Sequence, residues 1–180
     1  MKVLSVNIGK RKIVSWRGKD VETGIFKYPV DKSIFLGKED VENDAVVDRK
    51  YHGGIDKAVY GYSFEHYDYF KKLHPDLDWN YGMFGENITF SRLNEDEITV
   101  GSIYKLGECK LEVSKPRQPC YKLGIRFNTP KIVKQFWNSS KSGIYFKVLE
   151  TGNVKVDDEL VLLNKLLDAS TIAEVYETKK

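Results

Sequence analysis

The segment Cys109-Lys110-Leu111-Glu112-Val113 alternates apolar and polar residues and follows another β-like run at residues 103–106. Because successive side chains of a strand point to opposite faces, Cys109, Leu111 and Val113 share a face that we expect to be buried. Gly107-Glu108 between the runs favours a hairpin. Similar short runs, separated by Gly, Pro, Asn and Asp, recur about every ten residues, which is typical of a β-sandwich or barrel. The sequence therefore predicts a mostly β fold.

The remaining elements follow from the same patterns and fit one main domain. We expect a β domain over residues 1–165, with a short helix and tail at residues 166–180 packed on it. Lys10-Arg11-Lys12 is interpreted as a solvated turn rather than a binding patch. Further strands are predicted at residues 3–8, 25–30, 33–36, 58–62, 88–90, 143–149 and 159–163, and helices at residues 64–73, 129–138 and 169–176.

Composition excludes several classes of function. The 180 residues carry 29 basic and 26 acidic side chains, a net charge of +3, which gives no case for general nucleic-acid binding. No apolar run is long enough to span a bilayer, and the N-terminus lacks the pattern of a signal sequence. Two cysteines without such a signal point to a reducing compartment, so we expect a cytoplasmic protein with no membrane partner.

One cysteine lies in an unusual setting, Lys115-Pro116-Arg117-Gln118-Pro119-Cys120-Tyr121-Lys122, called here the Cys120 segment. Each proline fixes its own φ and pushes its predecessor toward an extended conformation, so we expect an irregular segment that is neither helix nor central strand. Nearby cations favour the thiolate, which is both nucleophile and metal ligand. The alternative is that Cys120 is a small buried apolar residue, as free cysteines usually are.

A second stretch of interest is His52-Gly53-Gly54, which lies between Arg49 and Lys57. Glycines allow backbone conformations in which successive N–H groups converge into an anion-binding nest, and the three basic side chains could add donors. The alternative is a hairpin turn with solvated charges. Asn87, before another strand, could likewise orient a ligand or bond the local backbone, and its turn role is favoured by spacing.

Three motifs together resemble those of MOSC domains, named after the C-terminal domain of molybdenum-cofactor sulfurase. They are His52-Gly53-Gly54-Ile55-Asp56-Lys57-Ala58-Val59, Phe84-Gly85-Glu86-Asn87 and Pro116-Arg117-Gln118-Pro119-Cys120-Tyr121-Lys122-Leu123. The sequence is most similar to the stand-alone bacterial branch associated with resistance to 6-N-hydroxylaminopurine. It departs from the family at Gly101-Ser102, where an acidic residue is common. The resemblance implies an antiparallel β-barrel with a few peripheral helices.

The resemblance also implies a site and a cofactor. In the family, the cysteine that matches Cys120 handles sulfur or binds the molybdenum of the molybdopterin cofactor. Arg117 is then the second catalytic residue, and it would hold the sulfur deprotonated and attract the cofactor's phosphate together with Lys122. The residues expected to bind the cofactor are Arg49, His52, Gly53, Gly54, Lys57, Asn87, Arg117, Tyr121 and Lys122.

Three functions remain open at this point. The first is an oxidoreductase that reduces small N-hydroxylated bases or related N–O compounds, with electrons from a separate protein. Two cysteines cannot supply the four thiolates of a common iron–sulfur cluster. The second is a sulfur carrier with a persulfide on Cys120. The third is a cofactor-binding or anion-binding module without turnover, which tight binding without activity would favour.

Overall fold

The computed structural model covers residues 1–180 and describes the side chains of residues 1–49 and 52–180. The structure is mostly β, as predicted. Its strands are β1 (Val3–Gly9), β2 (Lys12–Trp16), β3 (Lys19–Thr23), β4 (Lys27–Pro29), β5 (Ile34–Leu36), β6 (Val59–Ser63), β7 (Ile88–Phe90), β8 (Ile103–Leu106), β9 (Cys109–Pro116), β10 (Ile144–Glu150), β11 (Gly152–Val154) and β12 (Leu160–Asn164).

The helices are short. A 3₁₀ turn at Ile55–Lys57 precedes β6, and another at Phe64–His66 precedes the helix Tyr67–Leu73. Among the described residues, no helix has the length and apolar character needed to cross a membrane. The α-helices are α1 (Arg49–His52), α2 (Tyr67–Leu73), α3 (Tyr121–Arg126), α4 (Lys131–Asn138) and α5 (Ile172–Glu177).

Eight strands form one sheet in the order β12-β8-β9-β10-β6-β7-β1-β4. The antiparallel barrel expected from the family is corrected here to an open, mixed sheet. β6 and β7 are parallel, and the strand pairs of the described residues leave β12 and β4 at the two ends of the order. A parallel pair needs a long crossover, here through α2, and short β-like runs in a sequence do not specify the direction of pairing. An isolated bridge between Lys2 and Glu159 brings the N-terminus to the residue before β12.

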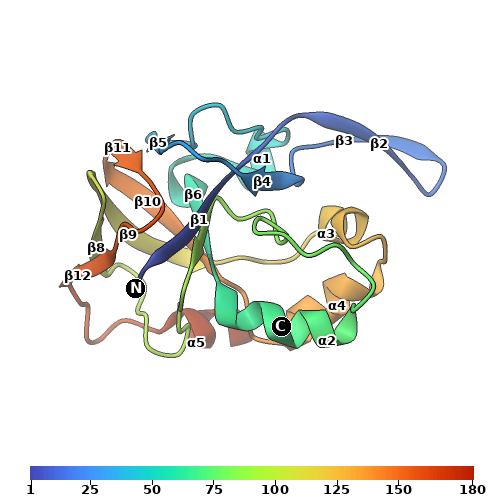
Figure 1. Cartoon of the computed structure of the whole chain (residues 1–180). Helices are drawn as coiled ribbons and strands as arrows, with labels where there is room; N and C mark the ends of the chain where they lie inside the picture. Colours follow the sequence, from blue (N-terminus) through green and yellow to red (C-terminus); the bar gives the residue numbers. More distant parts are fainter.

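Two hydrophobic cores support the sheet. The first lies among the strands and includes Val6, Leu111 and Phe146. The second is aromatic and joins β6 to the helices, with the rings of Tyr62 and Phe84 stacked at 4.3 Å between centroids. In Figure 1, the sheet occupies one side of the molecule and α2, α3 and α4 the other.

Helix α5 packs on the body of the protein, as expected. A capping box between Thr171 and Glu174 fixes its first turn, and Ile172 is buried in the first core. The Tyr176 hydroxyl donates a hydrogen bond to the Phe136 carbonyl oxygen at 3.3 Å. The boundary drawn at residue 165 stays a prediction.

The sequence patterns missed β11, α1 and α3, and they also missed a projecting part of the fold. Residues 10–23 contain strands β2 and β3, which form a two-stranded ribbon, called here the arm, that extends away from the sheet (Figure 1). Lys12 therefore belongs to a strand, not to the solvated turn that we expected at Lys10-Arg11-Lys12. Charged residues interrupt the apolar alternation of this stretch, so its strand pattern is weak.

Candidate functional site

The Cys120 segment is partly regular, which corrects the expectation of an irregular segment. Strand β9 continues through Pro116, which pairs with Ile144 of β10. Helix α3 begins at Tyr121, directly after Cys120. A proline restricts itself and its predecessor, so Pro119 leaves the residues that follow it free to form a helix. The irregular part is limited to residues 117–120.

The two cysteines have different environments. Cys109 is buried in the first core, and burial, with Glu108 and Asp158 nearby, raises the pKa of its thiol to about 12. This agrees with its predicted place on the buried face of a strand. Cys120 is only partly buried, and no disulfide joins it to Cys109. One alternative for Cys120 was a small buried apolar residue. That description fits Cys109 better than Cys120.

The Arg117 side chain is buried, with 5% of its surface exposed. Its guanidinium lies 4.8 Å from the centroid of the Tyr60 ring and donates a hydrogen bond to the Phe84 carbonyl oxygen. No carboxylate among the described side chains forms an ion pair with it. A buried cation usually has a paired anion, because removing a charge from water is costly. Arg117 thus provides positive charge that the protein itself does not neutralise by direct pairing.

A buried carboxylate fixes the loop that accepts this hydrogen bond. Glu86 accepts hydrogen bonds from the backbone N–H groups of Gly82 and Phe84, both at 3.0 Å, and from Thr89 Oγ1 at 2.8 Å. The Tyr67 hydroxyl also donates to it. Phe84 therefore donates to Glu86 through its N–H and accepts from Arg117 through its carbonyl. This arrangement holds the guanidinium in one position.

Six of the predicted residues line a single pocket that is open to solvent. These six residues provide a thiol, three cationic side chains, an imidazole and an amide, and the lining also includes Lys27, Asp44 and Asp48. The predicted residues that the structure brings together here are His52, Lys57, Asn87, Arg117, Cys120 and Lys122.

The imidazole of His52 is neutral in this setting. Its pKa is lowered to about 4, first by burial and then by the positive charges of Arg117, Lys122 and Lys57, while Asp48 acts in the opposite direction. A neutral imidazole has one N–H donor and one acceptor nitrogen. At neutral pH, His52 can therefore donate one hydrogen bond to an anion but adds no charge to the pocket.

This shift predicts how stability depends on pH. Because the folded-state pKa of His52 is below its usual 6.5, the unfolded chain binds the proton first, and the fold loses stability as pH falls from about 6.5 to about 4. We expect His52→Gln to reduce this loss by about 2–3 kcal/mol, a value discounted for partial exposure. Urea unfolding of both proteins across this pH range measures the effect. Parallel stability curves for the two proteins would contradict the assignment.

Asn87 ties strands together as well as lining the pocket. Its side-chain oxygen accepts a hydrogen bond from the Tyr60 N–H at 3.3 Å, and its amide donates to Asp44 at 3.0 Å. Asp44 also accepts from the Gly9 N–H at 2.8 Å and forms a buried ion pair with Lys27. These partners are distant from Asn87 in the sequence, so its side chain joins separate segments rather than bonding the local backbone as spacing had favoured. Its predicted contact with a cofactor remains a prediction.

Four predicted residues lie outside the lining of this pocket. Arg49 forms ion pairs with Asp40 at 2.7 Å and Glu39 at 3.4 Å on the surface. The dihedral angles of Gly53 (φ −136°, ψ −172°) and Gly54 (φ 90°, ψ 171°) differ from the alternation of right- and left-handed helical conformations that forms a nest. Tyr121 is exposed. The chain after Gly54 enters a 3₁₀ turn, so the hairpin alternative is not found either.

Gly54 still constrains its residue type, because its φ of 90° with an extended ψ is accessible almost only to glycine. No neighbouring atom lies within 4 Å of the position that a Cβ would take. We therefore expect Gly54→Ala to destabilise the fold by about 1–3 kcal/mol through backbone strain alone. The midpoint of chemical denaturation measures this. An unchanged midpoint would show that the turn relaxes to another conformation.

A second hollow adjoins the pocket on the outside. It shares His52, Lys57, Cys120 and Lys122 with the pocket, and Tyr121 lies on its wall. It also includes Lys115, which pairs with Asp56 at 3.0 Å, and Lys179. Cys120 thus borders both spaces. A molecule that extends from the inner pocket into the outer hollow would pass the sulfur.

Sequence reasoning missed much of the pocket wall. One wall comes from Thr23, Gly24 and Ile25 at the root of the arm, and another from residues 44–48 before α1. These loops carry no motif by which they could have been recognised. Tyr60 and Tyr145, which face each other across β6 and β10 with rings 5.0 Å apart, also line the pocket. Their strands were predicted, but the pairing of these strands was not, so an aromatic residue in each strand was the only available signal.

Comparison with known proteins agrees with this arrangement. A family model described as the MOSC domain matches residues 48–161. The chain is 38% identical over 163 residues to the uncharacterized protein YflK of Bacillus subtilis, covering 91% of this chain and 73% of that protein. It is 34% identical over 151 residues to a protein named "Reductase" from Gibberella moniliformis, covering 82% of this chain and 27% of that protein.

A solved structure extends the likeness to the whole chain. The crystal structure of YiiM from Geobacillus stearothermophilus matches with a TM-score of 0.81 and 33% identity, covering 99% of this chain and 83% of that one. The family model spans the His52, Phe84 and Cys120 motifs, all of which contribute to the pocket. This chain therefore belongs to the MOSC domain family.

Proposed function

We propose that this protein is an oxidoreductase that binds the molybdenum cofactor in the pocket and reduces N-hydroxylated bases or related N–O compounds, with Cys120 as the protein ligand to molybdenum. The observation that carries the proposal is that one pocket is lined by a partly buried thiol, Cys120, and by a buried guanidinium, Arg117, which has no carboxylate partner among the described side chains. The relative named "Reductase" supports the reaction class.

The residues present fit such a cofactor. A thiolate is a soft donor, which suits a metal that other sulfur atoms already hold. Among the described residues, no group of three or more His, Cys, Asp or Glu side chains could hold a metal ion. Cys120 supplies one ligand, and a cofactor would bring its remaining ligands with it. Arg117 and Lys122 would bind the cofactor's phosphate, since guanidinium groups match phosphate geometry.

The net reaction converts R–NH–OH, two electrons and two protons into R–NH₂ and water, with the N–O bond broken and the nitrogen reduced. The cofactor supplies the two-electron redox chemistry when bound. The protein supplies geometry and charge: Arg117 is fixed by Phe84, and Asn87 with Asp44 holds the loop that forms one wall. His52 is neutral before an anion arrives, and an anion beside it would raise its pKa and favour proton uptake at the ring.

The test is to purify the full chain from a host that makes the molybdenum cofactor and to measure molybdenum and turnover of 6-N-hydroxylaminopurine with a chemical reductant. We expect stoichiometric molybdenum and formation of the amine. A protein that lacks molybdenum from this host and remains inactive after cofactor reconstitution would contradict the proposal.

A second function is favoured by the position of Cys120 at the border between the inner pocket and the outer hollow. An accessible thiol in a cationic setting also suits a sulfur carrier that holds a persulfide. Mass spectrometry of Cys120 after incubation with a cysteine desulfurase and cysteine distinguishes the two. A persulfide on a protein that takes up no molybdenum would favour sulfur transfer.

A further inference from the structure

The arm is a projecting, basic element. Strands β2 and β3 form a separate two-stranded sheet, and among the described strand pairs they pair with each other. Residues 10–22 carry five cationic side chains against two acidic ones. Figure 1 shows the arm reaching beyond the rest of the protein on the side opposite β8 and β12. An isolated pair of strands is only marginally stable in water. The arm therefore adds little to the stability of the fold, and a purely structural role does not explain why it is present.

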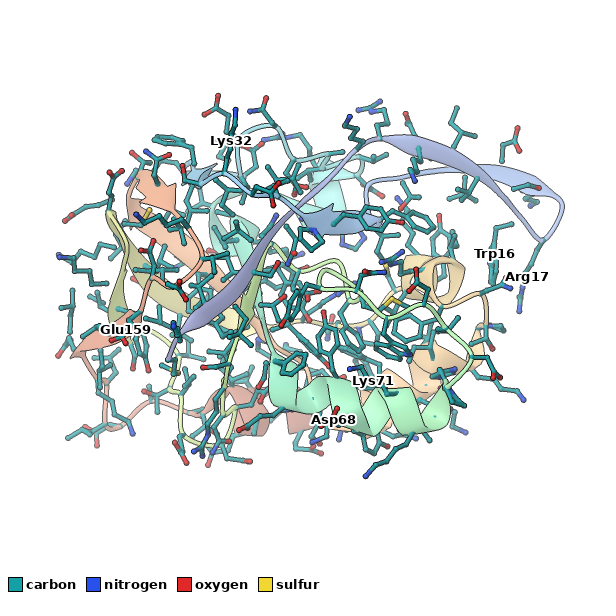
Figure 2. All side chains as sticks on the ribbon, in the orientation of Figure 1. Trp16, Arg17, Lys32, Asp68, Lys71 and Glu159 are labelled. Carbon is teal, nitrogen blue, oxygen red and sulfur yellow. The ribbon has the colours of Figure 1, made fainter. Side chains whose placement is uncertain are left out.

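The arm also carries side chains that are common at protein interfaces, with Arg17 exposed and Trp16 half-buried. Ile13 is 70% exposed. Trp16 and Arg17 lie at the tip, as Figure 2 shows, with the Arg17 guanidinium 5.9 Å from the centre of the Trp16 ring. Tryptophan and arginine dominate the binding energy of many protein interfaces. The cationic residues around them would form a rim that attracts a negatively charged partner.

The root of the arm connects it to the pocket. Lys12 lies over the rings of Phe26 and Tyr28, and Arg126 of α3 covers the same two rings from 5.3 and 5.0 Å. Thr23, the last residue of β3, is buried and lines the pocket. A partner bound along the arm would therefore stand beside the wall of the proposed redox site.

We propose that the arm is the docking site of an acidic electron-carrier protein, an inference that rests on the proposed reductase function. Reduction of one N–O bond takes two electrons, so two one-electron transfers oxidise two carrier molecules while the substrate takes up two protons and releases water. The nearly balanced charge of the whole chain favours a protein partner over nucleic acid.

The experiment uses a bacterial flavodoxin, a small acidic flavoprotein, as the probe. Lys10→Glu, Arg17→Glu and Lys19→Glu are combined in one variant of the full chain. Binding of oxidised flavodoxin is measured by surface plasmon resonance at low and high salt. We expect the wild type to bind in a salt-dependent manner, and the variant to bind about 10- to 100-fold more weakly, because like charges at an interface disfavour association.

A matched control separates docking from net charge. Lys105→Glu, Lys155→Glu and Lys165→Glu make the same change in charge among exposed residues at the opposite end of the molecule. This variant should bind flavodoxin almost as the wild type does. In the cofactor-loaded enzyme, the arm variant should show a raised KM for reduced flavodoxin and an unchanged rate with reduced methyl viologen, which needs no docking site.

Three results would overturn the inference. These are absence of flavodoxin binding by the wild type, equal weakening in both triple variants, and an arm variant that loses affinity for a short DNA duplex while it keeps affinity for flavodoxin. Absence of activity with methyl viologen contradicts the proposed function instead. The binding measurement still tests whether the arm binds the carrier in that case, because binding does not depend on turnover.

Discussion

Cys120→Ser is expected to leave the purified protein without stoichiometric molybdenum and to abolish reduction of N-hydroxylated substrates. A serine hydroxyl is a harder donor than a thiolate and stays protonated at neutral pH, so it replaces the sulfur poorly as a ligand. The side chain is partly exposed at the border of two hollows, and the two residues are similar in size. Folding should therefore be unaffected, and thermal unfolding of the cofactor-free proteins checks this.

The second cysteine of the chain is the control for this substitution. Cys109 lies in the first core, away from the pocket lining, and burial keeps its thiol protonated with a pKa of about 12. Cys109→Ala should lower stability modestly and retain molybdenum. A Cys120→Ser protein with full molybdenum content and full activity would rule out the proposed ligand.

Arg117→Met is expected to weaken cofactor binding by about 100- to 1,000-fold, because truncating one partner of a buried charge pair commonly costs about 2–5 kcal/mol. Its effect on the cofactor-free fold should be much smaller. The substitution removes a buried cation that lacks a carboxylate partner, which is favourable, and a hydrogen bond to the Phe84 carbonyl, which is unfavourable. Molybdenum content after purification and urea unfolding of the cofactor-free protein measure the two effects separately.

The matched control is Arg126→Met, which makes the same change in another guanidinium that lies over aromatic rings. Arg126 contacts Phe26 and Tyr28 and is outside the lining of the pocket. It should therefore change stability but not molybdenum content. Equal loss of molybdenum in both variants would show that Arg117 acts through the fold rather than as an anion-binding residue.

The sequence predicted the elements whose chemistry is local. Alternation of apolar residues gave the hairpin of β8 and β9, and it assigned Cys109 to the buried face. Three motifs pointed to His52, Asn87, Arg117 and Cys120, which the fold brings into one pocket. Motifs can point to residues that lie close together because each carries a particular charge or ligand chemistry, whatever the path of the chain between them.

Features that depend on distant segments were not predictable in this way. The parallel pairing of β6 with β7 depends on how the chain returns after α2, which the strand patterns do not encode. The pocket wall at residues 44–48 is positioned by hydrogen bonds of Asp44 with Gly9 and Asn87, and these three residues are far apart in the sequence. The motif region around Gly54 was recognised, but its backbone dihedral angles follow from the surrounding fold and contradict a nest.

The central place of β10 has a consequence for synthesis on the ribosome. This strand, Ile144–Glu150, lies between β9 and β6, so these two strands have no common partner until about four-fifths of the chain has been made. The bridge between Lys2 and Glu159 forms later still, because Glu159 is synthesised after β10. A nascent chain would therefore expose unpaired strand edges for most of its translation, which is the condition in which chaperones protect emerging β proteins from aggregation.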